Sequence, residues 1–117
     1  MNKATRKQIS EIIGRLNALA SVDAVTDAGA EDTQAQIEDA ASEIQSLADD
    51  ERDKFDNLPE GLQNSERGQE MQDAADMLEG AVSMLENIRI DVKNLQENWQ
   101  EEVVDEIEAA ISELEGI

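Results

Sequence analysis

The feature of this chain that most constrains its fold is an aliphatic periodicity that extends through most of its length. Leu, Ile, Val, Met and Ala recur at steps of three and four residues, and Phe55 and Trp99 are the only aromatic residues among 117. This spacing places apolar side chains along one side of a helix. Aliphatic stripes bury one another when helices pack, so the pattern predicts an all-α fold. We expect an antiparallel helical hairpin or bundle that forms a single domain over residues 1–117.

The first expected helix covers about residues 4–20, and a weaker segment follows it. Its apolar stripe consists of Ile9, Ile12, Ile13, Leu16 and Leu19. Over residues 21–32 the stripe fades, and Gly29 together with isolated Asp residues indicates a loop or a frayed connection.

A second helix is expected over about residues 33–57. Thr33 and Gln36 have the spacing of a capping box, which marks the start of a helix. The apolar repeat that follows is interrupted only at Glu51 and consists of Ile37, Ala41, Ile44, Ala48, Phe55 and Leu58. The helix should end before Pro59, because the residue preceding a proline is disfavoured in helical geometry.

A third helix is expected over residues 65–116, with Ser65 as its cap. Apolar residues hold a heptad spacing from Met71 to Trp99, and the spacing resumes at Val103 after a four-residue slip. One continuous coiled-coil-like helix of about 50 residues would be ~75 Å long. The alternative is two helices, with a break near residues 94–99.

A helix of that length cannot be covered by a 25-residue partner from the same chain, so either the first helix folds back along it or a second copy covers it. Its C-terminal part favours a homodimer, in which the self-associating residues would be Leu95, Trp99, Val103 and Ile107. The alternative is that Trp99 lies in the core of a monomer.

Charge limits the partners that this chain can bind. It carries 29 Asp and Glu against 9 Lys and Arg, a formal net charge of −20. Residues 1–20 are the only net-positive stretch. Charge of this size repels nucleic acid and anionic membranes and attracts basic protein surfaces. No apolar run approaches the ~18 residues of a membrane span. We therefore expect a cytoplasmic protein that binds neither nucleic acid nor membrane directly.

Most catalytic chemistry lacks its side chains here. The chain has no His, Cys or Tyr, which removes the side chain most often used for acid–base catalysis near neutral pH and the thiol nucleophile. Paired carboxylates are available, but sugar-cleaving sites of that kind usually need aromatic residues, and only two are present. The acidic run over residues 49–53 lacks the glycine that a calcium loop needs at its sixth position. We expect neither an enzyme nor a bound cofactor or metal ion.

The acidic residues form runs with few basic neighbours. Glu101 and Asp105, like Glu102 and Glu106, are like-charge pairs four residues apart, and each pair destabilises a helix by a few tenths of a kcal/mol. Repeated choices of this kind indicate that the charge has a use, although solubility alone is the alternative. The candidate partner-binding surface consists of Asp49, Asp50, Glu51, Asp53, Glu101, Glu102, Asp105, Glu106 and Glu108.

The turn between the second and third helices carries a resemblance. Residues 55–63 read Phe-Asp-Asn-Leu-Pro-Glu-Gly-Leu-Gln, and Ser-Glu-Arg-Gly follows at residues 65–68. This segment resembles the turn of small acidic helical accessory proteins encoded in phages and prophages. Residues 22–46 look like an insertion relative to that group, and the tail after Ile90 looks like an extension. The resemblance implies a viral accessory protein, present in the host cytoplasm, that functions by binding.

Three hypotheses follow from charge and resemblance. In the first, the protein is a DNA mimic that blocks a basic, DNA-binding host protein such as a restriction, nuclease or CRISPR component. In the second, it is a coiled-coil structural or assembly protein whose charge serves solubility. In the third, it inhibits a basic toxin or enzyme without copying DNA.

Overall fold

A computed structural model describes residues 3–90, 95 and 97–117. Within these residues the chain contains helices and no strand, so the expected all-α class is confirmed. The helices are α1 (Lys3–Leu19), α2 (Val22–Asp56), α3 (Glu60–Gln63), α4 (Glu66–Glu86) and α5 (Trp99–Glu115).

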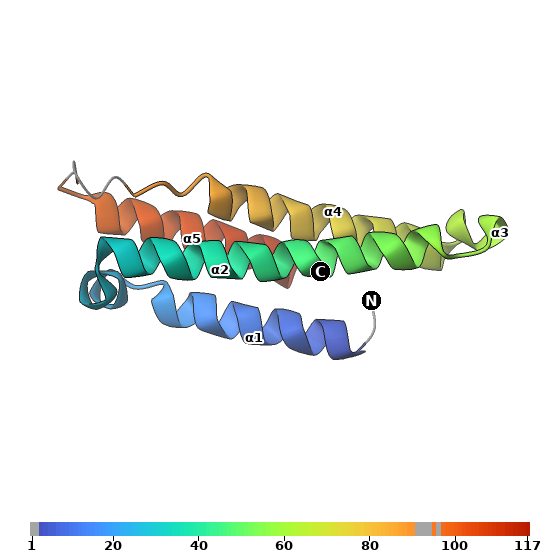
Figure 1. The fold of residues 1–117 in the computed structure, drawn as a ribbon, viewed down its shortest axis with the longest axis horizontal. Helices are drawn as coiled ribbons and strands as arrows, with labels where there is room; N and C mark the ends of the chain where they lie inside the picture. Colours follow the sequence, from blue (N-terminus) through green and yellow to red (C-terminus); the bar gives the residue numbers. More distant parts are fainter. Residues whose placement is uncertain (1–2, 91–94, 96) are drawn as a thin grey trace.

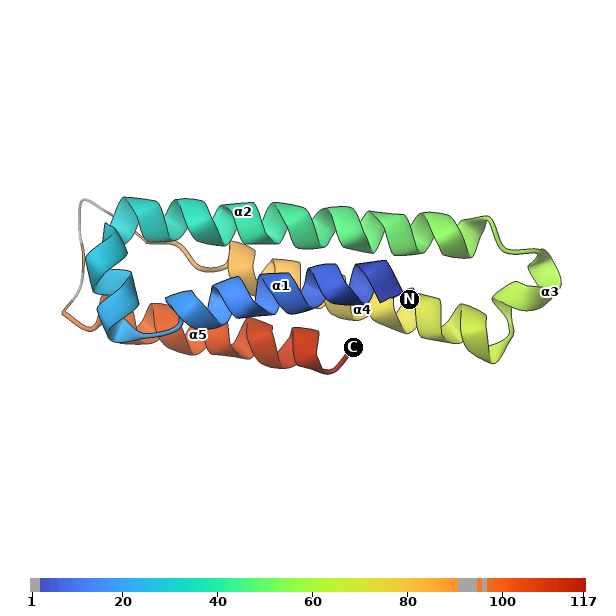
Figure 2. The same cartoon turned by 90° about the horizontal axis from the view of Figure 1, so that it is seen from below.

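Four of the helices form an up-down-up-down bundle (Figure 1, Figure 2). Helices α2 and α4 make the long antiparallel hairpin, and α1 and α5 pack against it and against each other. The short helix α3 forms the tip of the hairpin. The molecule is a rod with extents of 54 × 22 × 17 Å.

The core is aliphatic and draws on every helix of the bundle. Four residues of the stripe expected in the first helix are buried, whereas Ile13 is only partly buried. The largest side chains with essentially no exposed surface include Leu16, Ile37, Ile44, Leu78, Leu85, Ile107 and Leu114. Each expected stripe therefore covers a neighbouring helix within the same chain.

The segment expected to be a loop over residues 21–32 is helical on both sides of a kink. Ser21 caps α2, since the Ala24 N–H donates to its side-chain oxygen at 3.1 Å. The kink is at Gly29, where φ is 82° and ψ is 165°. Thr33 is not the cap that its spacing with Gln36 suggested. It is fully buried, and its hydroxyl donates across the kink to the Val25 carbonyl at 3.4 Å.

The turn at the tip follows local sequence signals. Helix α2 ends at Asp56, just before the proline, and Ser65 caps α4 by accepting from the Gly68 N–H at 3.3 Å. A Cβ on Gly68 would lie 2.3 Å from the Gln63 carbonyl oxygen, so only glycine fits this close approach.

The single helix expected over residues 65–116 is instead two helices. Helix α4 ends at Glu86, and the following backbone is held by the Ile90 N–H, which donates to the side-chain oxygen of Gln34 at 3.1 Å. The chain becomes helical again only at Trp99. The two-helix alternative is therefore correct, although α4 ends earlier than residues 94–99, of which 94 and 96 lie outside the described residues. By folding back, α5 buries its stripe against α1, α2 and α4.

We predict that Gly29→Ala destabilises the fold by ~1–3 kcal/mol, because the backbone at Gly29 occupies a region that is essentially restricted to glycine. The matched control is Gly14→Ala in α1, where a Cβ meets nothing within 4 Å. That change should stabilise the protein by ~0.5–1 kcal/mol, since alanine favours a helix interior. Urea unfolding of both variants measures the difference. Equal effects of the two substitutions would contradict the strained geometry at Gly29.

Candidate interaction surface

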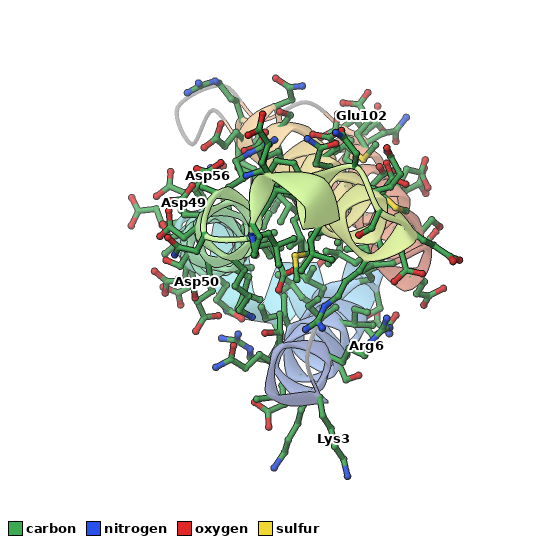
Figure 3. The ribbon with its side chains drawn as sticks, turned by 90° about the vertical axis from the view of Figure 1, so that its right-hand side faces the viewer. Lys3, Arg6, Asp49, Asp50, Asp56 and Glu102 are labelled. Atoms are coloured by element: carbon green, nitrogen blue, oxygen red, sulfur yellow. The ribbon has the colours of Figure 1, made fainter. Side chains whose placement is uncertain are left out.

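The expected acidic residues lie on the outside of the bundle, with one exception. Asp49, Asp50 and Asp53 are exposed on α2, and Glu101, Glu102, Asp105, Glu106 and Glu108 are exposed on α5. The two groups are not brought together. In the end view, Asp49 and Asp50 lie outside α2, whereas Glu102 lies on a different side of the rod (Figure 3).

Glu51 is the exception, and its assignment to the partner-binding surface was wrong. Its side chain is fully buried, and Lys54 Nζ donates to its Oε1 at 3.2 Å. Glu51 occupies the position at which the apolar repeat of α2 is interrupted, so it faces inward with that repeat. It has a structural role and is not available to a partner.

The residues expected to mediate self-association are largely used inside the chain. Val103 and Ile107 are buried in the bundle core, and Trp99 is partly buried and packs against the same core. Leu95 is 43% exposed. The apolar stripe of α5 is therefore covered by the chain's own helices, which removes the reason for which a second copy was expected.

Charge is distributed unevenly among the helices. Helix α2 carries twelve acids and two bases, α4 carries six acids and one base, and α5 carries seven acids and no base. Helix α1 has the opposite balance, with one acid and four bases. Lys3 and Lys7 are four residues apart and form a basic ridge, whereas Arg6 and Arg15 lie on opposite flanks of the helix. Lys3 projects away from the rest of the molecule beyond α1 (Figure 3). The acidic surface therefore covers three sides of the rod, and α1 interrupts it on the fourth.

Several of the few basic side chains are engaged by acids of neighbouring helices. Arg52 of α2 binds Glu79 of α4 through two hydrogen bonds, Nε to Oε1 at 2.7 Å and Nη2 to Oε2 at 2.8 Å. The same guanidinium donates to Asp76 Oδ1 at 3.0 Å. Arg15 of α1 pairs with Glu43 of α2. Sequence reasoning did not identify these pairs, because their members are far apart along the chain.

No carboxylate of α5 belongs to an ion pair among the described residues. Glu106 is exposed, but partial desolvation of its carboxyl raises its pKa, and the nearby charge of Glu102 raises it further. Ionisation of Glu106 is therefore less favourable in the folded protein than in the unfolded chain. By contrast, the hydrogen bonds from Arg52 lower the pKa of Glu79.

The described residues form several open clefts between helices. One of about 320 Å³ lies between α1 and α2 and is lined mainly by polar side chains such as Gln8, Glu11 and Ser46. In the part of the chain that the structure describes, no group of three or more His, Cys, Asp or Glu residues is placed to hold a metal ion. None of the helices formed by these residues is both long and apolar enough to cross a bilayer.

Comparison with known proteins found no matching family model, no matching curated protein and no matching solved structure.

We predict that Arg52→Gln destabilises the protein at pH 7 by about 1 kcal/mol or less, since the paired side chains are partly exposed to water. The lowered pKa of Glu79 sets the pH dependence. The ionised Glu79 carboxylate contributes fully to the free energy of unfolding above the ordinary carboxyl pKa. This contribution is lost as the pH falls through the lowered pKa of the folded protein. The gap in unfolding free energy between wild type and variant should therefore close at low pH.

Urea unfolding at pH 7 and at lower pH measures this gap. Arg89→Gln serves as the control, because Arg89 is exposed and forms no ion pair within the described residues. A gap that does not change with pH would show that the Arg52–Glu79 pair does not connect α2 to α4 in solution.

Proposed function

We propose that this protein is a DNA mimic, which binds a basic, DNA-binding protein and blocks its DNA-binding surface. The observation that carries the proposal is linear charge density. A net charge of −20 over a rod of 54 Å corresponds to one net charge per about 2.7 Å. Duplex DNA carries one charge per ~1.7 Å of its axis, and a single strand carries one per ~3.4 Å. The rod therefore lies between the two.

The placement of the charge supports a contact through the sides of the rod. The exposed acids of α2, α4 and α5 extend along the long axis, and α5 contains no base that would weaken the field. The basic ridge of α1 would face away from a basic partner. Such a distribution speeds association with a basic cleft and orients the approaching molecule.

The energetics of α5 favour a binding role over solubility alone. Solubility requires net charge, which well-spaced acids provide without mutual repulsion. Here Glu102 and Glu106 are adjacent on one helical face, and ionisation of Glu106 is less favourable than in the unfolded chain. A surface that retains charge at the expense of stability is expected when the charge binds something.

The resemblance of the turn adds a biological setting to this proposal. A phage-encoded inhibitor of a host restriction, nuclease or CRISPR component would act in the host cytoplasm by competitive occlusion, without catalysis. The alternative is an assembly protein that forms a homodimer through Leu95, Trp99, Val103 and Ile107. It has less support, because Val103 and Ile107 are buried within one chain.

The binding experiment compares host proteins retained by the immobilised chain with those retained by immobilised poly-glutamate. Proteins held only by the chain should be released by a short DNA duplex. The variant Glu101→Gln/Glu102→Gln/Asp105→Asn/Glu106→Gln should retain at least tenfold less of them at 150 mM salt, since it removes four charges from α5. The matched control, with Lys3→Gln and Lys7→Gln in the basic ridge, should retain as much as wild type. A retained protein that DNA does not displace would count against mimicry.

We also predict that Glu106→Gln raises stability by a few tenths of a kcal/mol at pH 7, because it removes a partly desolvated charge and its repulsion from Glu102. Because folding raises the pKa of Glu106, this gain should disappear as pH falls and the wild-type carboxyl becomes neutral. The control is the same substitution in a Glu102→Gln background, where the repelling charge is already absent and the gain should shrink. A loss of stability in Glu106→Gln would mean that this carboxylate makes a favourable contact in the fold.

A further inference from the structure

The rod has a step near one end, where four helices give way to two. Helices α2 and α4 continue toward α3 past the start of α1 and the end of α5 (Figure 1, Figure 2). The start of α1 lies close to the end of α5, since Arg6 donates to the Ile117 carbonyl at 3.4 Å. Beyond that level, neither α1 nor α5 covers the hairpin.

The apolar stripe of the hairpin extends past the step. Phe55 follows Ile44 and Ala48 at eleven and seven residues, so it faces the same side of α2. Ile44 and Ala48 are fully buried, whereas Phe55 and the neighbouring Leu58 are only half-buried. The apolar stripe of α2 thus extends beyond the four-helix part of the rod, and its side chains there are only partly buried.

A cleft of about 880 Å³ lies at this end of the hairpin, between the end of α2 and the start of α4. We call its lining the tip face, of which the side chains used here are Lys54, Leu58, Glu66, Arg67, Glu70 and Met71. The tip face contains two bases and two acids around two apolar side chains, in a chain whose net charge is −20. Lys54 also contacts buried Glu51, so Arg67 is the cation best placed to meet another molecule.

The equal numbers of bases and acids on the tip face determine what kind of molecule can bind there. Two copies of so acidic a chain repel one another through the sides formed by α2, α4 and α5. At the tip face, however, a twofold axis would bring Arg67 of each copy toward the acids of the other. Self-complementarity of this kind is what a symmetric dimer requires.

We propose that two copies of this chain associate through their tip faces, in an antiparallel arrangement that pairs Arg67 of each copy with Glu70 of the other. The half-buried Leu58 of both copies becomes covered at the centre of the contact. The overlap is limited to the end of the hairpin, and small interfaces are typical of weak complexes, so we expect a dimer that depends on concentration. It does not depend on the proposed DNA mimicry, and it differs from the dimer expected through α5.

The test mixes two variants, each of which destroys the pairing in its own homodimer. Arg67→Glu leaves only acids at the paired positions, and Glu70→Arg leaves only bases. Each variant alone should dimerise at least tenfold more weakly than wild type, whereas an equimolar mixture should form a heterodimer, because each Arg then meets a Glu. Sedimentation equilibrium from 10 µM to 2 mM at 150 mM salt measures all three samples and wild type.

Two controls separate pairing from net charge and from folding. Lys7→Glu and Asp39→Arg change the charge by the same amounts at exposed positions of α1 and α2, away from the tip face. They should leave wild-type dimerisation within about twofold and give no recovery on mixing. Circular dichroism checks that every variant is folded. A wild-type protein that remains a 12.9 kDa monomer up to 2 mM, or a mixture no more associated than its components, would overturn the proposal.

Discussion

The packing of α2 against α4 is the interaction on which the rest of the structure depends. Its centre is formed by large aliphatic side chains, including Ile37, Ile44, Leu78 and Leu85, all of which are fully buried. Alanines such as Ala48 and Ala75 are buried between them and allow the helices to approach closely. The free energy gained by this aliphatic contact between α2 and α4 must offset the repulsion among carboxylates on the outer faces. It does so without a fully buried aromatic side chain. The charge on the surface is tolerated because the stripes beneath it are continuous.

The sequence predicts the helical faces and the tip of the hairpin well, because both depend on local signals. Apolar spacing identifies the stripes, Pro59 ends α2 and Ser65 starts α4. The fold-back of α5 was not predictable in this way. A heptad pattern identifies the side chains that will be buried against another helix. It does not indicate whether that helix belongs to the same chain or to a second copy. No proline or glycine marks the end of α4 after Glu86, since that end is fixed by tertiary contacts such as the one from Ile90 to Gln34.

The candidate surface was predictable as a set of exposed acids but not as an arrangement. Helical phase places Asp49 and Glu102 outward, yet only the bundle topology puts α2 and α5 on different sides. Glu51 could have been identified, because it occupies an apolar position of the repeat and is therefore directed inward. The Arg52 pairs could not, since nothing in a local pattern brings residue 52 beside residues 76 and 79. Composition thus predicts the sign of the surface, whereas tertiary structure decides which charges stay unpaired.

The distribution of charge separates two kinds of contact on one molecule. The sides of the rod repel any acidic surface, including another copy, so they favour a basic partner. The tip face is the place where the bases Lys54 and Arg67 lie beside acids around apolar groups, and there like molecules can meet. If both contacts form, pairing at the tips would lengthen the acidic rod without covering its sides. A basic cleft that follows DNA over a long path would then meet a correspondingly longer charged surface, with each copy adding its own α2 and α5 faces.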